Sequence, residues 1–396
     1  MLTLDLIGRA NIPVLPMAVR DARALKWVAV ALLLGVAAWQ LRISARNLPV
    51  VDLVEYWSAA RLLLHGGNPY SPSQMLVIQK AAGWSQAAPL LMWNPPWTLA
   101  FVVPLGFMSY APTYLLWLTI NFTILVICAN KLWFHYGGSA QKPYVAWIAA
   151  LTFAPTLTVI GLGQIGPLIL LGITGFLLLR DGRPWLAGAA TVLIGLKPQL
   201  CYLFWIALVF WVIRERRWPV LAGAATAFAV AALVPLLFRP SIFGDYAAQF
   251  HAARLLSNPS PSLGTTLRWS VSPSSNSLQF VPSGLGAAWF VWYWRNKAVW
   301  EWSAGMPLLL VVSIATTSYG WLFDHVVLLP AVLQIATLIV QRHDAVKSLT
   351  ITLSYFLINA GIALCIRSHA IGIAYTWVAP AWLVLYMMAS SVLYRA

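Results

Sequence analysis

The chain has 396 residues, of which 61% are hydrophobic and only 9% are charged. Soluble domains contain about 45–50% apolar and about 25% charged residues, so this composition excludes an ordinary soluble enzyme and also a disordered chain. The formal net charge is +15, from 25 Lys and Arg against 10 Asp and Glu, but no nucleic-acid-binding motif accompanies it. The basic residues lie mostly in short loops between apolar runs, which indicates membrane orientation and contact with anionic lipids.

Apolar runs of roughly 17–25 residues, long enough to cross a bilayer as helices, recur from Leu25 to Leu393. The candidate spans are residues 25–43, 96–110, 113–134, 144–160, 164–179, 185–196, 199–213, 218–238, 285–294, 304–322, 325–341, 348–366 and 370–392. The sequence therefore predicts an all-α, polytopic membrane protein.

The basic loops set the expected orientation, because Lys and Arg concentrate on the cytoplasmic side. The predicted cytoplasmic groups are Arg9, Arg20, Arg23 and Lys26, the runs 180–183 and 214–217, Arg295 with Lys297, Arg342 with Lys347, and Arg395. Between outer residues 45–92 and inner Arg180 lie four apolar stretches, although an odd number of crossings is required. We expect one stretch to be re-entrant or fused at the break Gly161 to Pro167, which leaves about 12 crossings.

Two long segments, residues 45–92 and 239–284, fall on the predicted outer side. The first predicts a short helix from Val51 to Leu64, because Gly66-Gly67-Asn68-Pro69 ends a helix and turns the chain. The second is rich in Ser, Pro and Asn and predicts an irregular loop. We expect one integral membrane domain over 1–396, with a catalytic module over about 1–213 and a more variable helical module over about 214–396.

Acidic residues are few, and only four lie on the predicted outer side: Asp52, Glu55, Asp245 and Asp324. Asp52 and Glu55 are three residues apart on the predicted first helix and therefore face the same way. A carboxylate at this position can act as a general base at a membrane surface. Asp is also a favoured N-cap, so Asp52 is equally interpreted as the residue that opens the helix, and the two roles are compatible.

Three basic residues are candidates for binding a phosphate on the outer side. Lys197 stands between two apolar runs and can hold a phosphate as a point charge, or it is a lysine that snorkels from a helix end. His325 follows Asp324 at the start of a span and can neutralise a phosphate, although a lone interfacial histidine without chemistry is the commoner case. Arg268 in the second outer segment is a weaker candidate, with a solvated loop as the alternative.

The sequence contains no zinc spacing, phosphate-cradling glycine loop or Ser/His/Asp nucleophile arrangement. Cys128, Cys201 and Cys365 lie inside apolar runs at unrelated spacings and predict neither disulfides nor a metal site. The sparse outer carboxylates also argue against a dedicated metal cage. We therefore expect no cofactor and no dedicated metal cage, and whether the reaction uses a divalent metal stays open.

Several strings, taken in chain order, resemble motifs of glycosyltransferase family 87. They are Val51-Asp52-Leu53-Val54-Glu55-Tyr56-Trp57-Ser58-Ala59-Ala60 with Gly67-Asn68-Pro69-Tyr70, Trp93-Asn94-Pro95-Pro96, Gly163-Gln164, Arg183-Pro184-Trp185-Leu186-Ala187-Gly188, Gly195-Leu196-Lys197-Pro198, and Asp324-His325-Val326-Val327-Leu328-Leu329-Pro330. Each string is weak alone, but their order and spacing over about residues 50 to 340 are more specific.

The resemblance implies a GT-C fold and a polyprenol-phosphate-mannose-dependent mannosyltransferase. It implies transfer with inversion from a polyprenyl-phosphate sugar to a glycolipid or glycan acceptor, in a bacterial cytoplasmic membrane, with the active site on the outer (periplasmic or extracytoplasmic) face. Asp52 would be the base, and His325 would lie at the donor phosphate with Lys197 and Arg268. The further substrate-binding candidates are Glu55, Tyr70, Trp93, Asn94, Gln164 and Asp324.

Two other classes of function remain open at this point. A transporter or flippase of lipid-linked sugars would use broken helices, and the Gly163-Gln164 region favours it. Transporters also tend to carry ionisable residues within their spans and to show paired repeats, and neither is seen here. A non-catalytic assembly protein of the membrane would leave Asp52 dispensable.

Overall fold

The computed structural model describes residues 49–252, 259–297, 299–341 and 344–394, and within these ranges every regular element is a helix. The predicted first span, the basic residues before it, and Arg342 and Arg395 lie outside the described residues. The α-helices are α2 (Leu53–Leu64), α3 (Pro72–Ala81), α4 (Leu99–Val102), α5 (Tyr110–His135), α6 (Tyr144–Leu151), α7 (Ala154–Leu162), α8 (Gly166–Leu179), α9 (Pro184–Ile194), α10 (Tyr202–Glu215), α11 (Trp218–Phe238), α12 (Ile242–Ala252), α13 (Leu263–Val271), α14 (Val281–Arg295), α15 (Trp302–Thr316), α16 (Leu329–Gln341), α17 (Ala345–Arg367) and α18 (Val378–Tyr394). The 3-10 helices are η1 (Pro96–Thr98), η2 (Val103–Phe107), η3 (Pro198–Cys201), η5 (Asn276–Phe280), η6 (Leu322–Leu328) and η7 (Gly372–Tyr375).

Six helical segments of the described chain are long and apolar enough to cross a membrane. They are Tyr110–His135, Pro198–Glu215, Trp218–Phe238, Leu322–Gln341, Ala345–Arg367 and Gly372–Ser391. The pair α6 and α7 would make a seventh, although it is bent by 67° at its break. Four further apolar helices contain only 10–17 residues and are therefore not counted among these candidate spans. The chain is thus an all-helical membrane protein.

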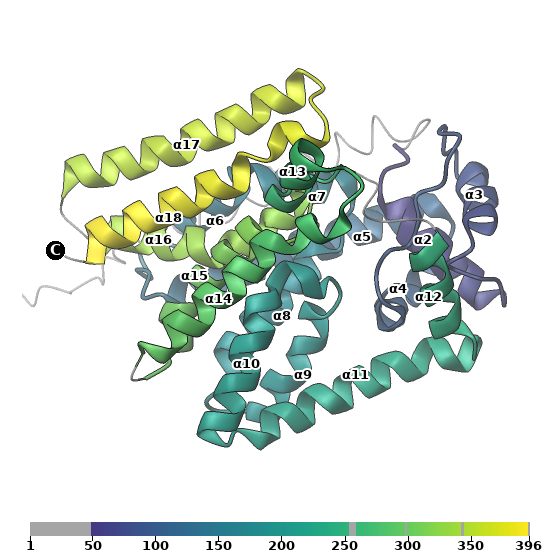
Figure 1. Ribbon diagram of the computed structural model, residues 1–396, viewed down its shortest axis with the longest axis horizontal. Helices are drawn as coiled ribbons and strands as arrows, with labels where there is room; N and C mark the ends of the chain where they lie inside the picture. Colours follow the sequence, from purple (N-terminus) through teal and green to yellow (C-terminus); the bar gives the residue numbers. More distant parts are fainter. Residues whose placement is uncertain (1–48, 253–258, 298, 342–343, 395–396) are drawn as a thin grey trace, which may run out of the picture.

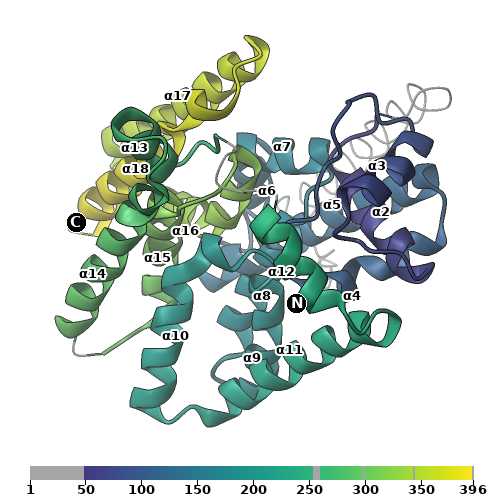
Figure 2. The same ribbon diagram turned by 45° about the vertical axis from the view of Figure 1, so that its right-hand side comes forward.

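The first and the last helices of the described chain lie apart. Figure 1 shows α2, α3 and α4 at the right and α14 to α18 at the left, and Figure 2 shows the same separation from another side. Helix α11 extends from α9 to the neighbourhood of α12. It packs closely on α9, because a Cβ added at Gly188 would lie 1.8 Å from the carbonyl oxygen of Val220. Small residues at such a crossing let two membrane helices approach.

Helix α2 begins and ends close to the predicted bounds, and its end follows from local chemistry. Gly66 has a φ of +73°, a conformation that glycine adopts without strain, and the Gly67 N–H donates to the Leu62 carbonyl at 2.7 Å. The same segment also contains a helix that the sequence analysis did not predict. Helix α3 follows Ser71, which caps it, and has Pro72 in its first turn.

The prediction of an irregular loop over 239–284 is wrong, because this segment contains α12, α13 and η5. The Ser262 side chain accepts a hydrogen bond from the Thr265 N–H and so caps α13. The carboxylate of Asp245 lies in the first turn of α12, where it complements the helix dipole, and pairs with Arg239 at 2.5 Å. Ser- and Asn-rich composition therefore marks helix caps here.

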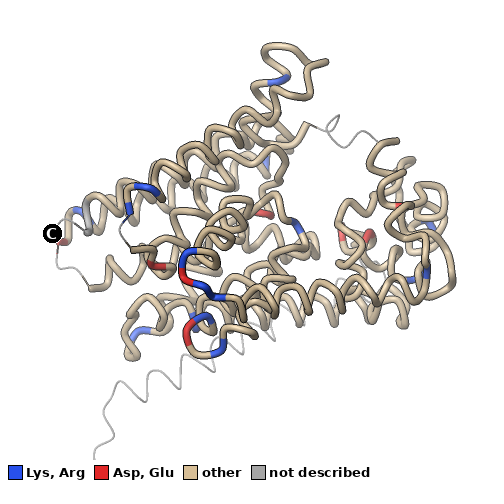
Figure 3. The backbone as a smooth tube through the Cα atoms, turned by 60° about the horizontal axis from the view of Figure 1, so that its bottom comes forward, with Lys and Arg blue, Asp and Glu red and all other residues tan. Residues whose placement is uncertain are grey.

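Charged residues are sparse along the backbone and concentrate near helix ends (Figure 3). Arg180 at the end of α8 lies 3.6 Å from Glu301, the N-cap of α15, and 3.3 Å from Asp181. Arg214 at the end of α10 donates to the carbonyl of Lys297 at 3.5 Å. These contacts gather three of the predicted cytoplasmic groups at one end of α8, α10 and α15.

Candidate functional site

The amide of Gln164 is the centre of a polar group at the opposite end of α8. Its Nε2 donates to Asp52 Oδ2 at 2.7 Å. Its Oε1 accepts from the hydroxyl of Tyr56 at 2.8 Å and from Nζ of Lys197 at 3.3 Å. Gln164 is only 4% exposed, so these bonds fix the orientation of its side chain.

The backbone around Gln164 is held by helix α5. Trp117 donates its indole N–H to the Gly163 carbonyl at 2.7 Å, and Asn121 donates to the Gln164 carbonyl at 3.1 Å. Gly163 ends α7 with a φ of +67°, in the left-handed region that favours glycine. A Cβ at Gly163 would lie 2.9 Å from Cβ of Leu53, so this turn packs against the first residue of α2. Asp52 and Gln164 are thereby brought together from segments 112 positions apart.

Asp52 occupies the N-cap position of α2, but its side chain makes no capping hydrogen bond. The carboxylate bonds to Gln164 instead, so the capping interpretation describes its position and not the use of its side chain. Burial raises the pKa of Asp52 above its ordinary value, and the Gln164 hydrogen bond and the Lys197 charge oppose this rise. A carboxylate with a raised pKa is a stronger base than a solvated aspartate.

Lys197 and Asp324 form an ion pair of 2.8 Å at the Gln164 amide. Asp324 is 2% exposed and accepts a second hydrogen bond from the Trp321 N–H at 2.9 Å. The Lys197 ammonium also lies 4.8 Å from the ring centroid of Phe323, within the range of a cation–π contact. The cation is therefore held by an acid, an amide and an aromatic face.

Glu55 lies one helical turn beyond Asp52 and is buried. Burial raises its pKa to about 8, while the Lys197 charge and a hydrogen bond from the Trp93 backbone oppose the rise. Glu55 is thus mostly protonated at neutral pH, whereas Asp52 is the less buried of the two carboxyls. The carboxyl groups of Asp52 and Glu55 thus have different surroundings, although both belong to the start of α2.

The segment after Met92 makes hydrogen bonds to the turn that precedes Lys197 and so holds this turn against the rest of the site. Asn94 is 4% exposed and donates to the Leu196 carbonyl at 2.9 Å. The Tyr70 hydroxyl donates to the Asn94 carbonyl at 3.0 Å, and Trp97 donates to the Gly195 carbonyl at 2.9 Å. Asn94 and Tyr70 therefore support the site, with their polar atoms already engaged by the protein.

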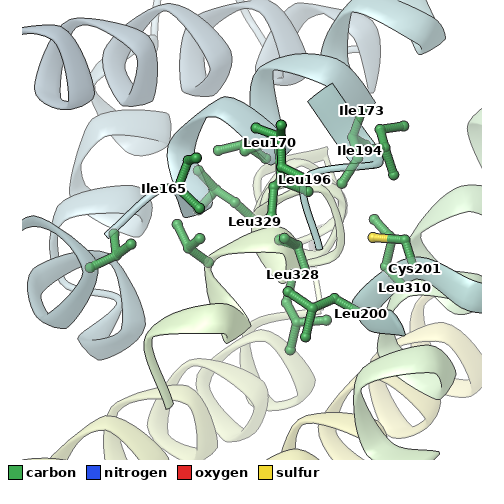
Figure 4. Close-up of a cluster of buried hydrophobic side chains, with 14 of the residues drawn as sticks. Ile165, Leu170, Ile173, Ile194, Leu196, Leu200, Cys201, Leu310, Leu328 and Leu329 are labelled. Atoms are coloured by element: carbon green, nitrogen blue, oxygen red, sulfur yellow. The ribbon is translucent and has the colours of Figure 1, made fainter. Parts of the chain in front are cut away.

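An apolar cluster lies directly under the polar residues. Figure 4 shows Ile165, Leu196 and Leu328 pointing toward one another with side chains from η3, α8, α9 and α15. Ile165 and Leu196 are adjacent in sequence to Gln164 and Lys197, and all three apolar side chains are at most 1% exposed. Their packing fixes the backbone that carries the polar group.

Among the described residues, no hydrogen bond joins His325 to this group. His325 is 4% exposed, and its Nδ1 has no hydrogen-bond partner there. Arg268 is 3% exposed and donates to the Asn276 side chain at 3.0 Å, within the α13–η5 unit. The roles of His325 and Arg268 at a donor phosphate stay predictions.

No three His, Cys, Asp or Glu side chains gather as metal ligands in the part of the chain that the structure describes. Four residues of the site were not predicted from the sequence: Tyr56, Tyr319, Trp321 and Phe323. The spacing of two between the last three, immediately before Asp324-His325, is the signal that identifies them.

A comparison with models of protein families matches residues 93–316 to glycosyltransferase family 87, more than half of the chain. The chain belongs to this family. The resemblance seen in the sequence is confirmed at that level, and the protein is a membrane glycosyltransferase. No curated protein and no solved structure matches the chain significantly. The matched region includes Gln164 and Lys197, whereas Asp52 and Asp324 lie outside it.

Proposed function

We propose that this protein is an inverting glycosyltransferase with a GT-C fold. It transfers a sugar, mannose in the best-known case of the family, from a polyprenyl phosphate to a glycolipid or glycan on the outer face of the bacterial cytoplasmic membrane. One observation carries the proposal. A single buried amide, Gln164, bonds both to a carboxylate of raised pKa, Asp52, and to a cation, Lys197.

The reaction needs these two groups at one place. Asp52 takes the proton of the acceptor hydroxyl as its oxygen forms a bond to the anomeric carbon from the side opposite the phosphate. The bond between that carbon and the phosphate oxygen breaks, and both electrons leave with polyprenyl phosphate. Lys197 stabilises the negative charge that develops there, because a fixed cation in a water-poor site acts strongly on such charge.

Among the described residues, hydrogen-bond acceptors engage only two of the N–H groups of Lys197. An ammonium group has three N–H donors, and the described residues accept two of them, through Gln164 and Asp324. The remaining donor is available to a phosphate oxygen. The side chain of Lys197 is 14% exposed against 2% for Asp324, so the cation is the accessible member of the pair.

The positions of the basic loops support an outer active site. Gln164 precedes α8 and Arg180 follows it, and the 14 residues of this helix span about 21 Å. The same holds for α10, with Lys197 near its start and Arg214 near its end. If the Arg180, Arg214 and Glu301 end is cytoplasmic, as the rule of basic loops requires, the Asp52 site faces the other side. The count of about 12 crossings belongs to this proposed topology.

A transporter or flippase of lipid-linked sugars is the second candidate, and the break between α6, α7 and α8 favours it. The two functions make different use of Asp52. A transporter binds and releases its cargo without chemistry, so it needs no base.

The test uses the full chain in lipid nanodiscs with radiolabelled polyprenyl-phosphate mannose and an envelope lipid and glycan extract as acceptor. We expect Asp52→Asn to lower transfer of the label by at least about 100-fold, the usual contribution of a general base, and to leave donor binding intact. The matched control is Asp245→Asn, which removes another predicted outer carboxylate, one that pairs with Arg239 outside the site. Full transfer by the folded Asp52→Asn protein would contradict the proposal.

A further inference from the structure

Three aromatic side chains border the Lys197–Asp324 ion pair. They are Tyr319, Trp321 and Phe323, named here the aromatic strip, and all three are half-buried. The rings of Trp321 and Phe323 are stacked, with centroids 6.4 Å apart and an interplanar angle of 16°. Tyr319 meets Trp321 edge-on at 6.2 Å.

The backbone explains why these positions share one side. Trp321 is extended, with φ −120° and ψ 166°, so residues on either side of it alternate in direction. The intervening positions face the core: Leu322 is 8% exposed, and a Cβ at Gly320 would lie 3.3 Å from a methyl group of Leu200. Tyr319 and Trp321 are therefore on the side of this segment turned away from the core, whereas Phe323 also packs against the core.

Contacts join the aromatic strip to both members of the Lys197–Asp324 ion pair. The Trp321 N–H bonds to Asp324, and the face of Phe323 receives the Lys197 ammonium. Burial raises the pKa of the Tyr319 hydroxyl, and the charges of Asp324 and Glu55 raise it further, which puts this hydroxyl within electrostatic reach of both acids. The strip is thus adjacent to the cation that would hold a phosphate.

The polar atoms of the strip leave its ring faces as the main binding feature. The indole N–H of Trp321 already donates to the Tyr319 hydroxyl at 3.0 Å. Trp57 of the first outer segment differs, because its indole N–H donates to the Met108 carbonyl and the residue is 6% exposed. A flat, partly exposed aromatic face beside a cation suits a ligand with C–H groups on a ring and an anionic substituent.

We propose that the aromatic strip is the subsite for the sugar ring of the donor, stacked on Trp321, while Lys197 holds the phosphate attached to that ring. This inference rests on the proposed function and adds the group that recognises the sugar. The inference assigns the sugar ring to the aromatic strip and the phosphate to Lys197, so measurements of binding alone can test it.

The experiment compares two probes, polyprenyl phosphate and polyprenyl-phosphate mannose, binding to the full chain in nanodiscs. We expect Trp321→Ala to weaken binding of the mannose-bearing lipid about tenfold, as a loss of about 1.4 kcal/mol produces, with no change for polyprenyl phosphate. Trp321→Phe retains a ring face and should restore most of the affinity. Lys197→Ala should weaken binding of both lipids. The control Trp292→Ala removes a tryptophan that is 63% exposed on α14 and should change neither affinity.

Other outcomes overturn specific parts. If Trp321→Ala weakens the binding of both lipids equally, or of neither, the aromatic strip does not recognise the sugar. The proposed function then stands as long as the wild type transfers mannose. If the wild type binds polyprenyl phosphate and its mannose derivative without transferring the sugar, the proposed function fails, and the strip is then judged by the Trp321→Ala comparison alone. If the wild type binds neither lipid, both proposals fail for this donor.

Discussion

The ammonium of Lys197 and the carboxylate of Asp324 lie 2.8 Å apart although 127 positions separate them in the sequence. Each residue is located where a helix begins, η3 for Lys197 and η6 for Asp324. The pair therefore ties two helix starts together at the site. Because Asp324 is almost fully buried, removal of Lys197 would leave a carboxylate without a charged partner in the protein interior.

Breaking this pair should be costly, and removing both charges should cost less than the sum. We expect Lys197→Met or Asp324→Asn to lower the free energy of unfolding by about 3–5 kcal/mol each, because either change leaves a buried charge without its partner. A double-mutant cycle in detergent, with denaturant unfolding, measures the coupling. Lys347→Met, in an exposed pair with Asp344, is the control and should cost about 0–1 kcal/mol. Additive losses at Lys197 and Asp324 would show that the pair is not coupled.

The rate of sugar transfer should depend on pH through the raised pKa of Asp52. A general base acts only when ionised, so the rate falls as the pH drops through its pKa. Burial raises that pKa above the ordinary 3.8, so the acid limb of kcat should lie above pH 3.8. Rates from about pH 3 to pH 9 with saturating donor test this. An acid limb at or below pH 3.8, or none at all, would contradict a raised pKa of Asp52 as the titrating base.

Gln164 should influence the pH at which this acid limb of the rate profile lies. Its amide N–H stabilises the ionised form of Asp52, so Gln164→Leu should move the acid limb to higher pH and lower kcat. Gln334→Leu is a matched control, because Gln334 is equally buried at 4% exposure and also accepts from a tyrosine hydroxyl, that of Tyr386. The control should lose stability without moving the limb. An equal displacement in both variants would indicate a structural cause.

Much of the helical pattern could be predicted from the sequence, because long apolar runs determine it. The predicted span 218–238 coincides with α11, and 113–134 lies inside α5. The helices α3, α12 and α13 could not be found in this way, since they are short and more polar, and their signals are caps such as Ser71 and Ser262.

The candidate site shows the same division. Asp52, Lys197, Gln164 and Asp324 carry chemistry that marks them individually in the sequence. No local pattern predicts that the Gln164 amide would join Asp52 and Lys197, because such contacts depend on how α5 and the apolar cluster position the turns. The lack of a hydrogen bond between His325 and this group among the described residues depends on the same packing. A motif identifies residue types, whereas packing determines which of them meet.

Glu55 should make stability depend on pH in an unusual direction. The unfolded carboxyl ionises near pH 4.5, whereas the folded one ionises at about 8. The folded state therefore binds more protons between these values, so stability is fully present below pH 4.5 and falls as the pH rises toward 8. In Glu55→Gln this loss is absent, and its melting temperature should rise relative to the wild type over that window.

Glu301→Gln provides the comparison of opposite sign. Glu301 accepts hydrogen bonds from the Ser303 and Ala304 N–H groups, and its pKa is lowered. Its stabilisation is present at neutral pH and is lost as the pH falls through the lowered pKa. The two variants should thus show opposite trends in melting temperature with pH. Parallel trends would contradict the buried, protonated state of Glu55.

The turn at Gly163 should be needed for both folding and activity. An alanine there must adopt a φ of +67° and place its Cβ 2.9 Å from Cβ of Leu53, so we expect Gly163→Ala to lower the free energy of unfolding by about 1–3 kcal/mol. Relief of the clash moves Leu53 and its neighbour Asp52 away from Gln164, so transfer activity should also fall.

Gly161→Ala, two residues earlier, isolates this effect. Gly161 lies within α7, and a Cβ there meets nothing within 4 Å. Alanine at this position should stabilise the helix by up to about 1 kcal/mol and leave transfer unchanged. Unfolding curves and transfer rates of the two variants, measured side by side, separate a general sensitivity of α7 from the specific contact with α2. Equal losses in both would mean that the Gly163 turn does not position Asp52.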